Sequence, residues 1–214
     1  MTKLLYATGN KYKIQSMVER LRGLDVEIIS PKDLNINIKV NENGKTVIEN
    51  AILKAKAYYD ITKLPTIAGD TALYVEKFEK QPGLYVHRVD GRELTPEETL
   101  AYYIESLNRV GGESEAYYNT GLVIIKDGMV YSKEIKEDMF ILTSRKLDKP
   151  CKYDALSQIQ YDPKIKKYIC ELTEEDIKKR NGTFDRGCVE FINEVLVREH
   201  NRLEGSNYDE REEL

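Results

Sequence analysis

The sequence contains no tryptophan, two histidines and three cysteines, and these scarcities exclude several kinds of site. With His87 and His200 as the only imidazoles and no Cys-x-x-Cys pair, structural zinc sites and Ser-His or Cys-His triads lack their residues. The cysteines, at positions 151, 170 and 188, are odd in number and far apart, which favours reduced thiols over a disulfide framework. Any catalysis must therefore rely on carboxylates and lysines.

Long hydrophobic runs and an excess of positive charge are also missing. No stretch approaches the roughly 20 apolar residues that a membrane span needs. The net charge is -4 and the pI is about 5.5, so no global positive field attracts nucleic acid or anionic lipid. We expect a cytoplasmic protein that binds neither membrane nor nucleic-acid polymer. Its 214 residues, 41% hydrophobic and 33% charged, suit one globular domain with an ample core.

Strand and helix patterns alternate in the first half of the chain. Residues 3–7 read as a buried strand, and the helix that follows Thr-Gly-Asn has its apolar residues on one stripe. Residues 26–29 read as the next strand, which favours a right-handed parallel crossover. A second helix is predicted over residues 46–61. Two strand pieces, 66–68 and 72–75, are expected on either side of Gly69-Asp70.

Capping and turn residues organise the second half. Thr95, Pro96 and Glu98 predict the start of a helix that extends to about residue 107. Asp127-Gly128 predicts a hairpin between residues 115–125 and 129–137. Helices are expected over 173–180 and 185–199. We expect one continuous fold with a β-hairpin lobe over residues 1–204, followed by a flexible acidic tail over 205–214.

The segment from Thr8 to Lys13 predicts an anion site. It lies where a strand ends and a helix begins, so backbone N–H groups, a hydroxyl, an amide and ammonium groups converge there. The Gly-x4-Gly-Lys-Ser/Thr spacing of a Walker loop is absent. The alternative is that Thr8 and Asn10 only cap the helix while the lysines are solvated.

Glu42 and Asp70 are candidate magnesium ligands. Both are expected at loop positions near the anion site, and Mg2+ takes carboxylates together with waters and phosphate oxygens. Asn50 and Lys54 are four residues apart on one helix, so they share a face that can present an amide and an ammonium to phosphates. The alternative for each carboxylate is an ordinary turn cap, and for Lys54 a solvated side chain.

Four segments, in order between Ala7 and Gly91, resemble the inosine triphosphate pyrophosphatase family, whose members hydrolyse non-standard purine nucleoside triphosphates to monophosphate and pyrophosphate. The segments read ATGNKYK, ENGKTVIENAILKAKA, PTIAGDTALYV and QPGLYVHRVDG. The resemblance implies an α/β fold, an elongated mixed-sheet sandwich of two lobes with the nucleotide in a central cleft. It also implies a homodimer and Mg2+ as cofactor.

The same resemblance implies roles for individual residues. Glu42 and Asp70 would hold Mg2+, and Asp70 would also activate the attacking water. Lys13 would act in catalysis as well as in phosphate binding. The nucleotide-binding set would comprise Thr8, Asn10, Lys13, Lys54, Thr71, Tyr153, Asp154 and Arg186.

The chain departs from the family pattern at three places. The family's Ala-Asp-Asp-Ser-Gly is Ala-Gly-Asp-Thr-Ala here, so Gly69 replaces the first acid. The family's base-reading loop, Phe-Gly-Tyr/Trp-Asp-Pro-x-Phe, is Cys-Lys-Tyr-Asp-Ala-Leu-Ser at residues 151–157, so only Tyr153 and Asp154 match. The family's Ser-His-Arg near the last helix is Phe-Asp-Arg at residues 184–186, so only Arg186 is kept. For Tyr153 and Phe184 the alternative to base stacking is ordinary packing, and for Arg186 it is a pair with Glu190.

Two main functions remain open at this point, and a related phosphatase that acts on pyrimidine or modified nucleotides is a third, weaker alternative. The first is a magnesium-dependent nucleoside triphosphate pyrophosphatase acting on ITP, dITP or XTP, or with an altered base preference. The second is a nucleotide-binding protein that has kept the phosphate site and lost efficient turnover. Replaced base readers leave the preferred base undetermined, because selectivity depends on pairing buried polar groups.

Overall fold

The computed structural model describes residues 1–149, 151 and 154–198, which form two compact units. The first unit contains residues 1–70, 121–134 and the described residues from 185 onward. The second contains residues 71–120 and the described residues of 135–184. The predicted acidic tail, 205–214, lies outside the described residues, as does Tyr153. Within the described part, no helix is long and apolar enough to cross a membrane.

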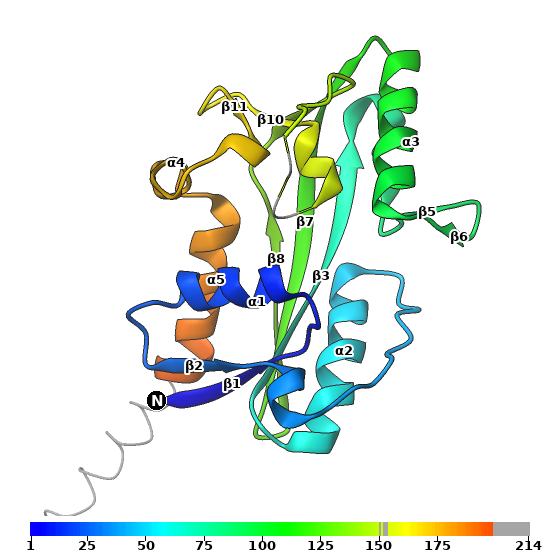
Figure 1. Ribbon diagram of the computed structural model, residues 1–214. Coiled ribbons are helices and arrows are strands. Elements are labelled where there is room, and N and C mark those ends of the chain that lie inside the picture. Colours follow the sequence, from blue (N-terminus) through cyan, green and yellow to red (C-terminus); the bar gives the residue numbers. More distant parts are fainter. Residues whose placement is uncertain (150, 152–153, 199–214) are drawn as a thin grey trace, which may run out of the picture. The chain divides into compact units, whose positions relative to one another are not determined.

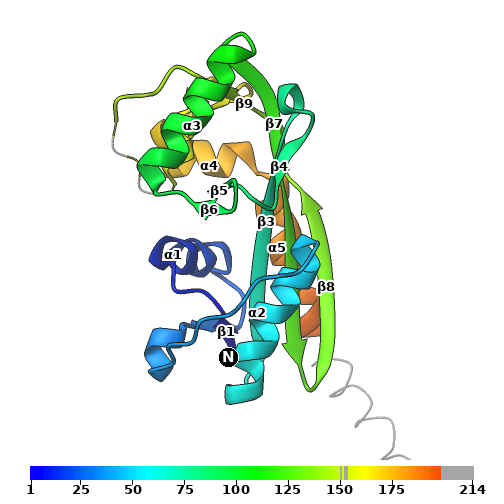
Figure 2. The same ribbon diagram turned by 90° about the vertical axis from the view of Figure 1, so that its right-hand side faces the viewer.

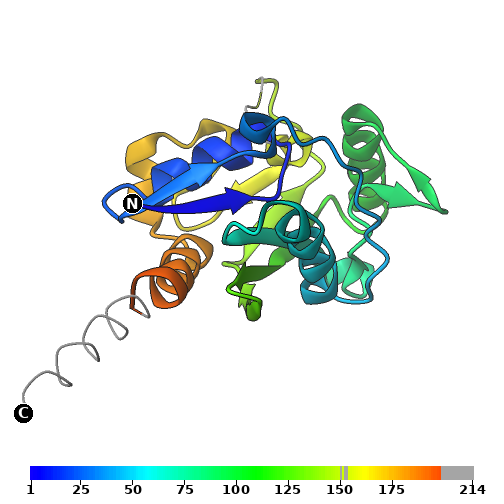
Figure 3. The same ribbon diagram turned by 90° about the horizontal axis from the view of Figure 1, so that it is seen from below.

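The first unit is built on parallel strands. β1 (Thr2–Tyr6) pairs in parallel with β2 (Val26–Ile29), and α1 (Lys11–Arg20) connects them, as predicted. Figure 3 shows the two strands side by side and pointing the same way. On its other edge β1 pairs in parallel with β3 (Thr66–Val75), and a short 3-10 turn, η1 (Pro31–Leu34), follows β2.

Helix α2 (Val47–Thr62) covers one face of this sheet. Its small residues Ala51 and Ala55 are fully buried, and they pack in one core with alternate residues of three strands. Those strand residues are Leu5, Ala7, Ala68, Val123 and Ile125. Helix α5 (Thr183–Asn193), which continues into a π-helical turn (Glu194–Arg198), lies with α1 on the opposite side (Figure 1). Residues alternating along a strand point to opposite faces, so each face has its own core.

Antiparallel strands make up the rest of the sheet. β7 (Glu113–Lys126), β9 (Phe140–Thr143), β10 (Gln160–Asp162) and β11 (Lys167–Tyr168) pair antiparallel in that order. β4 (Gln81–Gly83) pairs with the end of β3, and β8 (Met129–Lys136) pairs with β7. The hairpin of residues 121–134, from β7 and β8, belongs to the first unit and the other strands named here to the second. Figure 2 shows α3 (Pro96–Arg109) beside β7 and β9, with the small pair β5 (Arg88–Val89) and β6 (Arg92–Glu93) near its start.

Short helical turns complete the second unit. They are η2 (Glu76–Phe78), η3 (Ala155–Gln158), η4 (Ile169–Glu171) and α4 (Glu174–Arg180). Leu156 and Ile159 beside η3 are fully buried in a core with Tyr103 of α3 and Leu73 of β3. The unit therefore anchors the chain after Asp154 through apolar packing.

Several local predictions are confirmed. Thr95 and Glu98 form a reciprocal capping box at the start of α3, with Pro96 in the first turn. Asp127 and Gly128 both have positive φ angles, as a two-residue hairpin turn requires, and connect β7 to β8. The helix predicted from residue 185 begins earlier, at Thr183. The short strands β4, β5, β6, β9, β10 and β11 were not predicted.

The predicted break around Gly69-Asp70 is wrong. β3 runs without interruption from Thr66 to Val75, so Asp70 lies inside a strand rather than in a loop. Gly-Asp is a turn signal when read locally. Here β3 has β7 along one side, and on the other side it pairs with β1 at Thr66–Ile67 and with β4 at Leu73–Val75. Its place in the sheet before and after this dipeptide keeps the strand extended.

The prediction of three reduced thiols is also wrong. Cys151 and Cys170 form a disulfide, with Cα atoms 5.2 Å apart. Their separation of 19 positions carried no signal of contact, because the fold brings the segment before η3 onto η4. Cys188 is the free cysteine. It is buried in α5, and burial raises the pKa of its thiol to about 12.

Replacing Gly121 by alanine should destabilise the first unit. A Cβ at Gly121 would lie 2.8 Å from the carbonyl carbon of Val47 and 2.9 Å from the nitrogen of Ile48, at the start of α2. Backbone atoms cannot rotate away, so α2 must shift. We expect the free energy of unfolding to fall by about 1–3 kcal/mol in urea denaturation.

Gly9→Ala is the matched control for this experiment, because a Cβ at Gly9 meets nothing within 4 Å. Its free energy of unfolding should stay close to that of the wild type. Equal stability of Gly121→Ala and the wild type would contradict the close packing of α2 on β7.

Candidate functional site

Asp70 projects from β3 toward helix α2. Ala68, two residues earlier, is buried in the core beneath α2, so Asp70 shares that face of the strand. Gly69 points the other way, and a Cβ there would lie 3.1 Å from the side chain of Leu122 on β7. An acid at position 69 would therefore not lie beside the carboxylate of Asp70 in a regular strand.

One ammonium group links the two predicted metal ligands. Lys54 Nζ lies 2.7 Å from Glu42 Oε2 and 3.2 Å from Asp70 Oδ1. Asn50, one turn earlier on α2, donates from Nδ2 to Asp70 Oδ2 over 3.0 Å. Lys54 and Asp70 are only 17% and 18% exposed, and Glu42 is 38% exposed. The structure thus gathers four residues that the sequence singled out, within one unit.

The loop that carries Glu42 is attached to α2 by hydrogen bonds from its backbone N–H groups to side chains of the helix. Gly44 N–H donates to Asn50 Oδ1 over 2.8 Å, so one amide connects this loop to Asp70. A Cβ at Gly44 would lie 2.7 Å from Glu49 Cβ and 2.8 Å from Asn50 Oδ1, which explains the glycine. Thr46 caps α2 by accepting from Glu49 N–H. The helix start therefore fixes the position of the loop.

The segment Thr8–Lys13 lies at the same edge of the sheet as Asp70. β1 and β3 are parallel, with Tyr6 opposite Ile67, and both continue toward the same side beyond this pair. Asn10 caps α1, because its Oδ1 accepts from the N–H groups of Tyr12 and Lys13. The capping alternative is therefore realised for Asn10, while its carboxamide nitrogen takes no part in the cap. Lys13 is exposed.

Thr71 directs its hydroxyl into the second unit. Thr120 Oγ1 donates to Glu137 Oε1 over 2.8 Å, so it must accept from Thr71 Oγ1, 2.9 Å away. The Thr71 hydroxyl proton is thereby used within the protein. A role for Thr71 in nucleotide binding stays a prediction, and only an acceptor function of its oxygen is compatible with this network.

Asp154 lies in a group of polar side chains in the second unit. Its Oδ1 accepts from Leu156 N–H over 2.8 Å at the start of η3, and its Oδ2 lies 3.7 Å from His87 Nε2. The other ring nitrogen of His87 lies 3.4 Å from the buried hydroxyl of Thr99 on α3. His87 was not predicted as a site residue, because no pattern in the sequence indicates that it meets Asp154.

Two buried tyrosines lie close to this group. Burial raises the pKa of Tyr103 well above its ordinary value, and Tyr102 and the negative charge of Asp154 contribute. Burial likewise raises the pKa of Tyr118 well above its ordinary value, again with a contribution from Asp154. Gln160 donates to the Tyr118 oxygen. Both phenols therefore stay neutral and serve as hydrogen-bonding groups rather than as bases.

Asp185 stands where the family has the histidine of Ser-His-Arg, and the structure explains the aspartate. Asp185 pairs with Arg20 at the end of α1, within the first unit. Burial alone would lower the pKa of Arg20, but the charge and hydrogen bond of Asp185 raise it. Arg186 is exposed at the start of α5. Glu190, its predicted alternative partner, lies 3.5 Å from Lys133.

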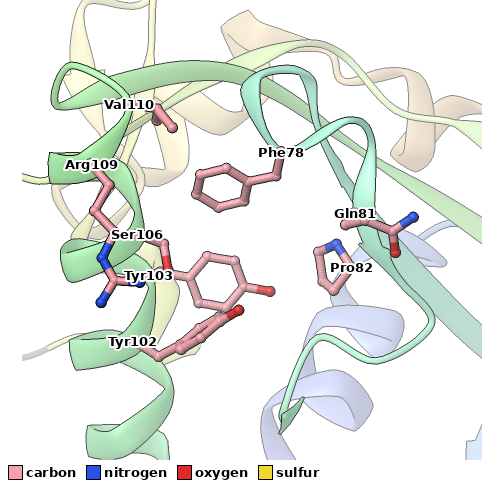
Figure 4. Close-up of a pocket in the computed structure, with 8 residues that line it drawn as sticks. All are labelled: Phe78, Gln81, Pro82, Tyr102, Tyr103, Ser106, Arg109 and Val110. Atoms are coloured by element: carbon pink, nitrogen blue, oxygen red, sulfur yellow. The ribbon is translucent and has the colours of Figure 1, made fainter. Parts of the chain in front are cut away.

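A cavity of about 220 Å³ lies elsewhere in the second unit, between α3 and the turn before β4 (Figure 4). It is lined by Phe78, Gln81, Pro82, Tyr102, Tyr103, Ser106, Arg109 and Val110. Arg109 at its edge pairs with Glu105. None of the predicted nucleotide or metal residues lines this cavity, so it adds nothing to the case for nucleotide binding.

Comparison with known sequences identifies related proteins. Residues 4–181 match the model of the Ham1 family. A dITP/XTP pyrophosphatase of Thermoanaerobacter pseudethanolicus is 31% identical over 197 residues, which are 92% of this chain and 98% of that protein. A protein of the same name from Leptospira interrogans is 32% identical over 133 residues, 62% of this chain and 66% of the relative. The matched region thus spans about two thirds of the Leptospira protein.

Solved structures show the same fold. A HAM1 protein from Coxiella burnetii superposes with a TM-score of 0.74 at 23% identity, covering 92% of this chain and all of that chain. The Staphylococcus aureus Ham1 protein gives a TM-score of 0.72, also at 23% identity, with 92% and 100% coverage. The mixed α/β fold predicted from the sequence is confirmed.

Asn50→Ala should loosen the acidic site. The substitution removes the acceptor of Gly44 N–H and the donor to Asp70, leaving two partly buried groups unpaired. We expect the free energy of unfolding to fall by about 1–3 kcal/mol in urea denaturation.

Asn108→Ala is the matched control, since Asn108 is exposed on α3. Its effect should stay within about 0.5 kcal/mol. If Asn50→Ala were as harmless as this control, the amide bridge between the loop and Asp70 would be refuted.

Proposed function

Because the chain belongs to the Ham1 family, we propose that it hydrolyses nucleoside triphosphates to the monophosphate and pyrophosphate. Its relatives include enzymes named dITP/XTP pyrophosphatases. The proposal rests above all on the convergence of Glu42 and Asp70 on the Lys54 ammonium, at the sheet edge where the Thr8–Lys13 segment begins α1. The proposed substrates are non-standard purine nucleotides such as ITP, dITP and XTP.

The donor set fits Mg2+. Oxygens of Glu42 and Asp70 approach one cation, the Lys54 ammonium, so they converge on a common point. Mg2+ prefers such oxygen ligands, and it commonly keeps waters and shares substrate phosphates instead of filling an all-protein cage. Among the described residues no group of three or more His, Cys, Asp or Glu side chains gathers as a metal site. When bound here, Mg2+ would neutralise negative charge on the phosphates.

The protein's own residues have separate tasks in the proposed reaction. Lys54 and Lys13 bind the phosphates and offset the charge that builds on the leaving pyrophosphate. A water attacks the α-phosphorus, the bond from that phosphorus to the bridging oxygen breaks, and Asp70 accepts a proton from the water. Asn50 holds the other oxygen of Asp70 and so orients the carboxylate. Asn10 and Thr8 complete the phosphate-binding segment.

The base is assigned to residues of the base-reading loop and of α5. Asp154 accepts hydrogen bonds from the base, with Tyr153 and Arg186 as further contacts. A carboxylate favours a base edge that carries N–H donors, as keto purines do at N1. The Asp185–Arg20 pair supports an altered base preference, since the side chain at that position is engaged within the protein.

Two further properties are part of the proposal. We place the protein in the cytoplasm, and we expect a homodimer, as the family resemblance implies. Neither bears on the chemistry assigned to Asp70 and Lys54, which lie in one unit of one chain.

A nucleotide-binding protein without turnover is the weaker candidate. The missing acid at Gly69 and the altered base-reading loop are the two observations that motivate it. In β3, however, position 69 faces Leu122 while Asp70 faces α2, so the glycine does not remove a neighbour of the Asp70 carboxylate. The geometry therefore favours the enzyme.

Asp70→Asn should abolish most turnover while the protein stays folded. The substitution keeps the side-chain volume and removes the charge that binds metal and accepts the proton. We expect pyrophosphate release from ITP to fall by a factor of about 100 or more, with an unchanged far-UV circular dichroism spectrum.

Asp60→Asn on the exposed side of α2 is the matched control. Asp60 pairs with Lys56 and Lys63 and is 50% exposed, so its loss should leave turnover within twofold. Wild-type pyrophosphate release by Asp70→Asn would refute the assignment of Asp70.

A substrate panel separates the two functions. Pyrophosphate release is measured with ITP, dITP, XTP, ATP, GTP and CTP, with Mg2+ and with excess EDTA. We expect release that depends on Mg2+ and is fastest with a keto purine. Binding of these nucleotides by calorimetry without release of pyrophosphate from any of them would favour the nucleotide-binding protein without turnover and reject the enzyme.

A further inference from the structure

The disulfide between Cys151 and Cys170 lies next to the proposed base reader. Cys151 precedes Asp154 by three positions, and both belong to the second unit. Cys170 lies in η4, directly after β11. The disulfide therefore attaches the chain before Asp154 to a separate part of the unit.

The part that holds Cys170 is itself well anchored. β11 pairs with β10, and β10 pairs with β9. Tyr168, which precedes η4, donates its N–H to Glu171 and packs its ring edge-on against Tyr161. Lys167 pairs with Asp176 of α4 over 2.8 Å. Cys170 is thus attached to the sheet edge, and its position does not depend on the base-reading loop.

Asp154 is held differently on its two sides. After it, η3 is fixed by the burial of Leu156 and Ile159 in the core. Its carboxylate is half exposed, with Oδ1 on Leu156 N–H and Oδ2 3.7 Å from His87 Nε2. A contact of that length between half-exposed groups holds a side chain only weakly. The covalent bond at Cys151 restricts the chain on the other side.

We propose that Cys151 and Cys170 are positioning residues, whose disulfide holds Asp154 where it reads the base and so makes the base-dependent part of nucleotide affinity sensitive to reduction. This inference rests on the proposed function. Both cysteines are partly exposed, so a small dithiol can reach the bond. The dithiol gives up two electrons and two protons and becomes a cyclic disulfide. The Sγ–Sγ bond breaks, and both cysteines end as thiols.

The position of the disulfide predicts which constants change. Lys54, Glu42 and Asp70 belong to the first unit, and neither cysteine does. Reduction should therefore weaken contacts with the base and leave phosphate binding and the chemical step intact. In kinetic terms, KM rises while kcat stays nearly constant.

The test compares a ligand that carries the base with one that lacks it. Calorimetry measures Kd for inosine monophosphate and for inorganic tripolyphosphate, before and after treatment with dithiothreitol. We expect the Kd of inosine monophosphate to rise about tenfold on reduction and that of tripolyphosphate to stay within twofold. With ITP as substrate, KM should rise by a similar factor at constant kcat.

A double variant, Cys151→Ser with Cys170→Ser, is the matched control. It should show the reduced-form constants and no response to dithiothreitol, although it keeps Cys188. Far-UV circular dichroism at the assay temperature checks that all forms are folded. Thiol titration of the denatured wild type should find one thiol before reduction and three after it.

Each other outcome contradicts the inference. Three thiols in unreduced protein would remove the disulfide. Unchanged Kd for inosine monophosphate, or equal weakening of inosine monophosphate and tripolyphosphate, would mean that the bond does not position a base reader. If no form releases pyrophosphate, the proposed function fails, but the two Kd values still decide whether the disulfide controls recognition of the base.

Discussion

The site depends on one constraint, which is that a single ammonium group must balance the negative charges of two carboxylates. Glu42 and Asp70 belong to separate segments of the chain, and Lys54 on α2 lies between them. Charged groups that lose much of their water are costly unless they are paired and hydrogen-bonded. Asp70 meets this requirement through Lys54 and Asn50 together. The lysine therefore keeps both acids close to one another.

The backbone around these residues is arranged to make this compensation possible. Gly44 allows the loop to approach α2 closely enough for its N–H to reach Asn50. Gly121 likewise allows β7 to pack closely beneath the first turn of α2. Asn50 then uses both ends of one carboxamide, accepting from Gly44 and donating to Asp70. Two glycines and one amide thus determine where the carboxylates lie.

Much of the fold could be predicted because its signals are local. The apolar stripes of α1 and α2, the capping box of Thr95 and Glu98, and the Asp127-Gly128 turn each depend on neighbouring residues. The common helical face of Asn50 and Lys54 was also predicted, since it follows from their spacing of four, and both side chains contact Asp70. What remained hidden depends on contacts between distant segments.

Such contacts account for the failures. Gly69-Asp70 reads as a turn, and only its place inside β3, a strand that pairs with β1, β4 and β7, keeps it extended. The bond from Cys151 to Cys170 and the approach of His87 to Asp154 join segments whose spacing has no pattern. Arg20 likewise meets Asp185 from the far end of the chain. The sequence therefore predicted the grouping of side chains around Lys54 better than the grouping around Asp154.

Neither compact unit is a continuous piece of sequence, and this has a consequence for folding during synthesis. The first unit takes its opening segment from residues 1–70, a hairpin from 121–134 and its closing helix from residue 185 onward. Glu42, Lys54 and Asp70 thus leave the ribosome well before β7, whose Val123 and Ile125 pack beneath α2. Nascent chains in which β7 has not yet emerged hold the acids without this part of their supporting core. The first unit receives its last segment only after every segment of the second has been synthesised.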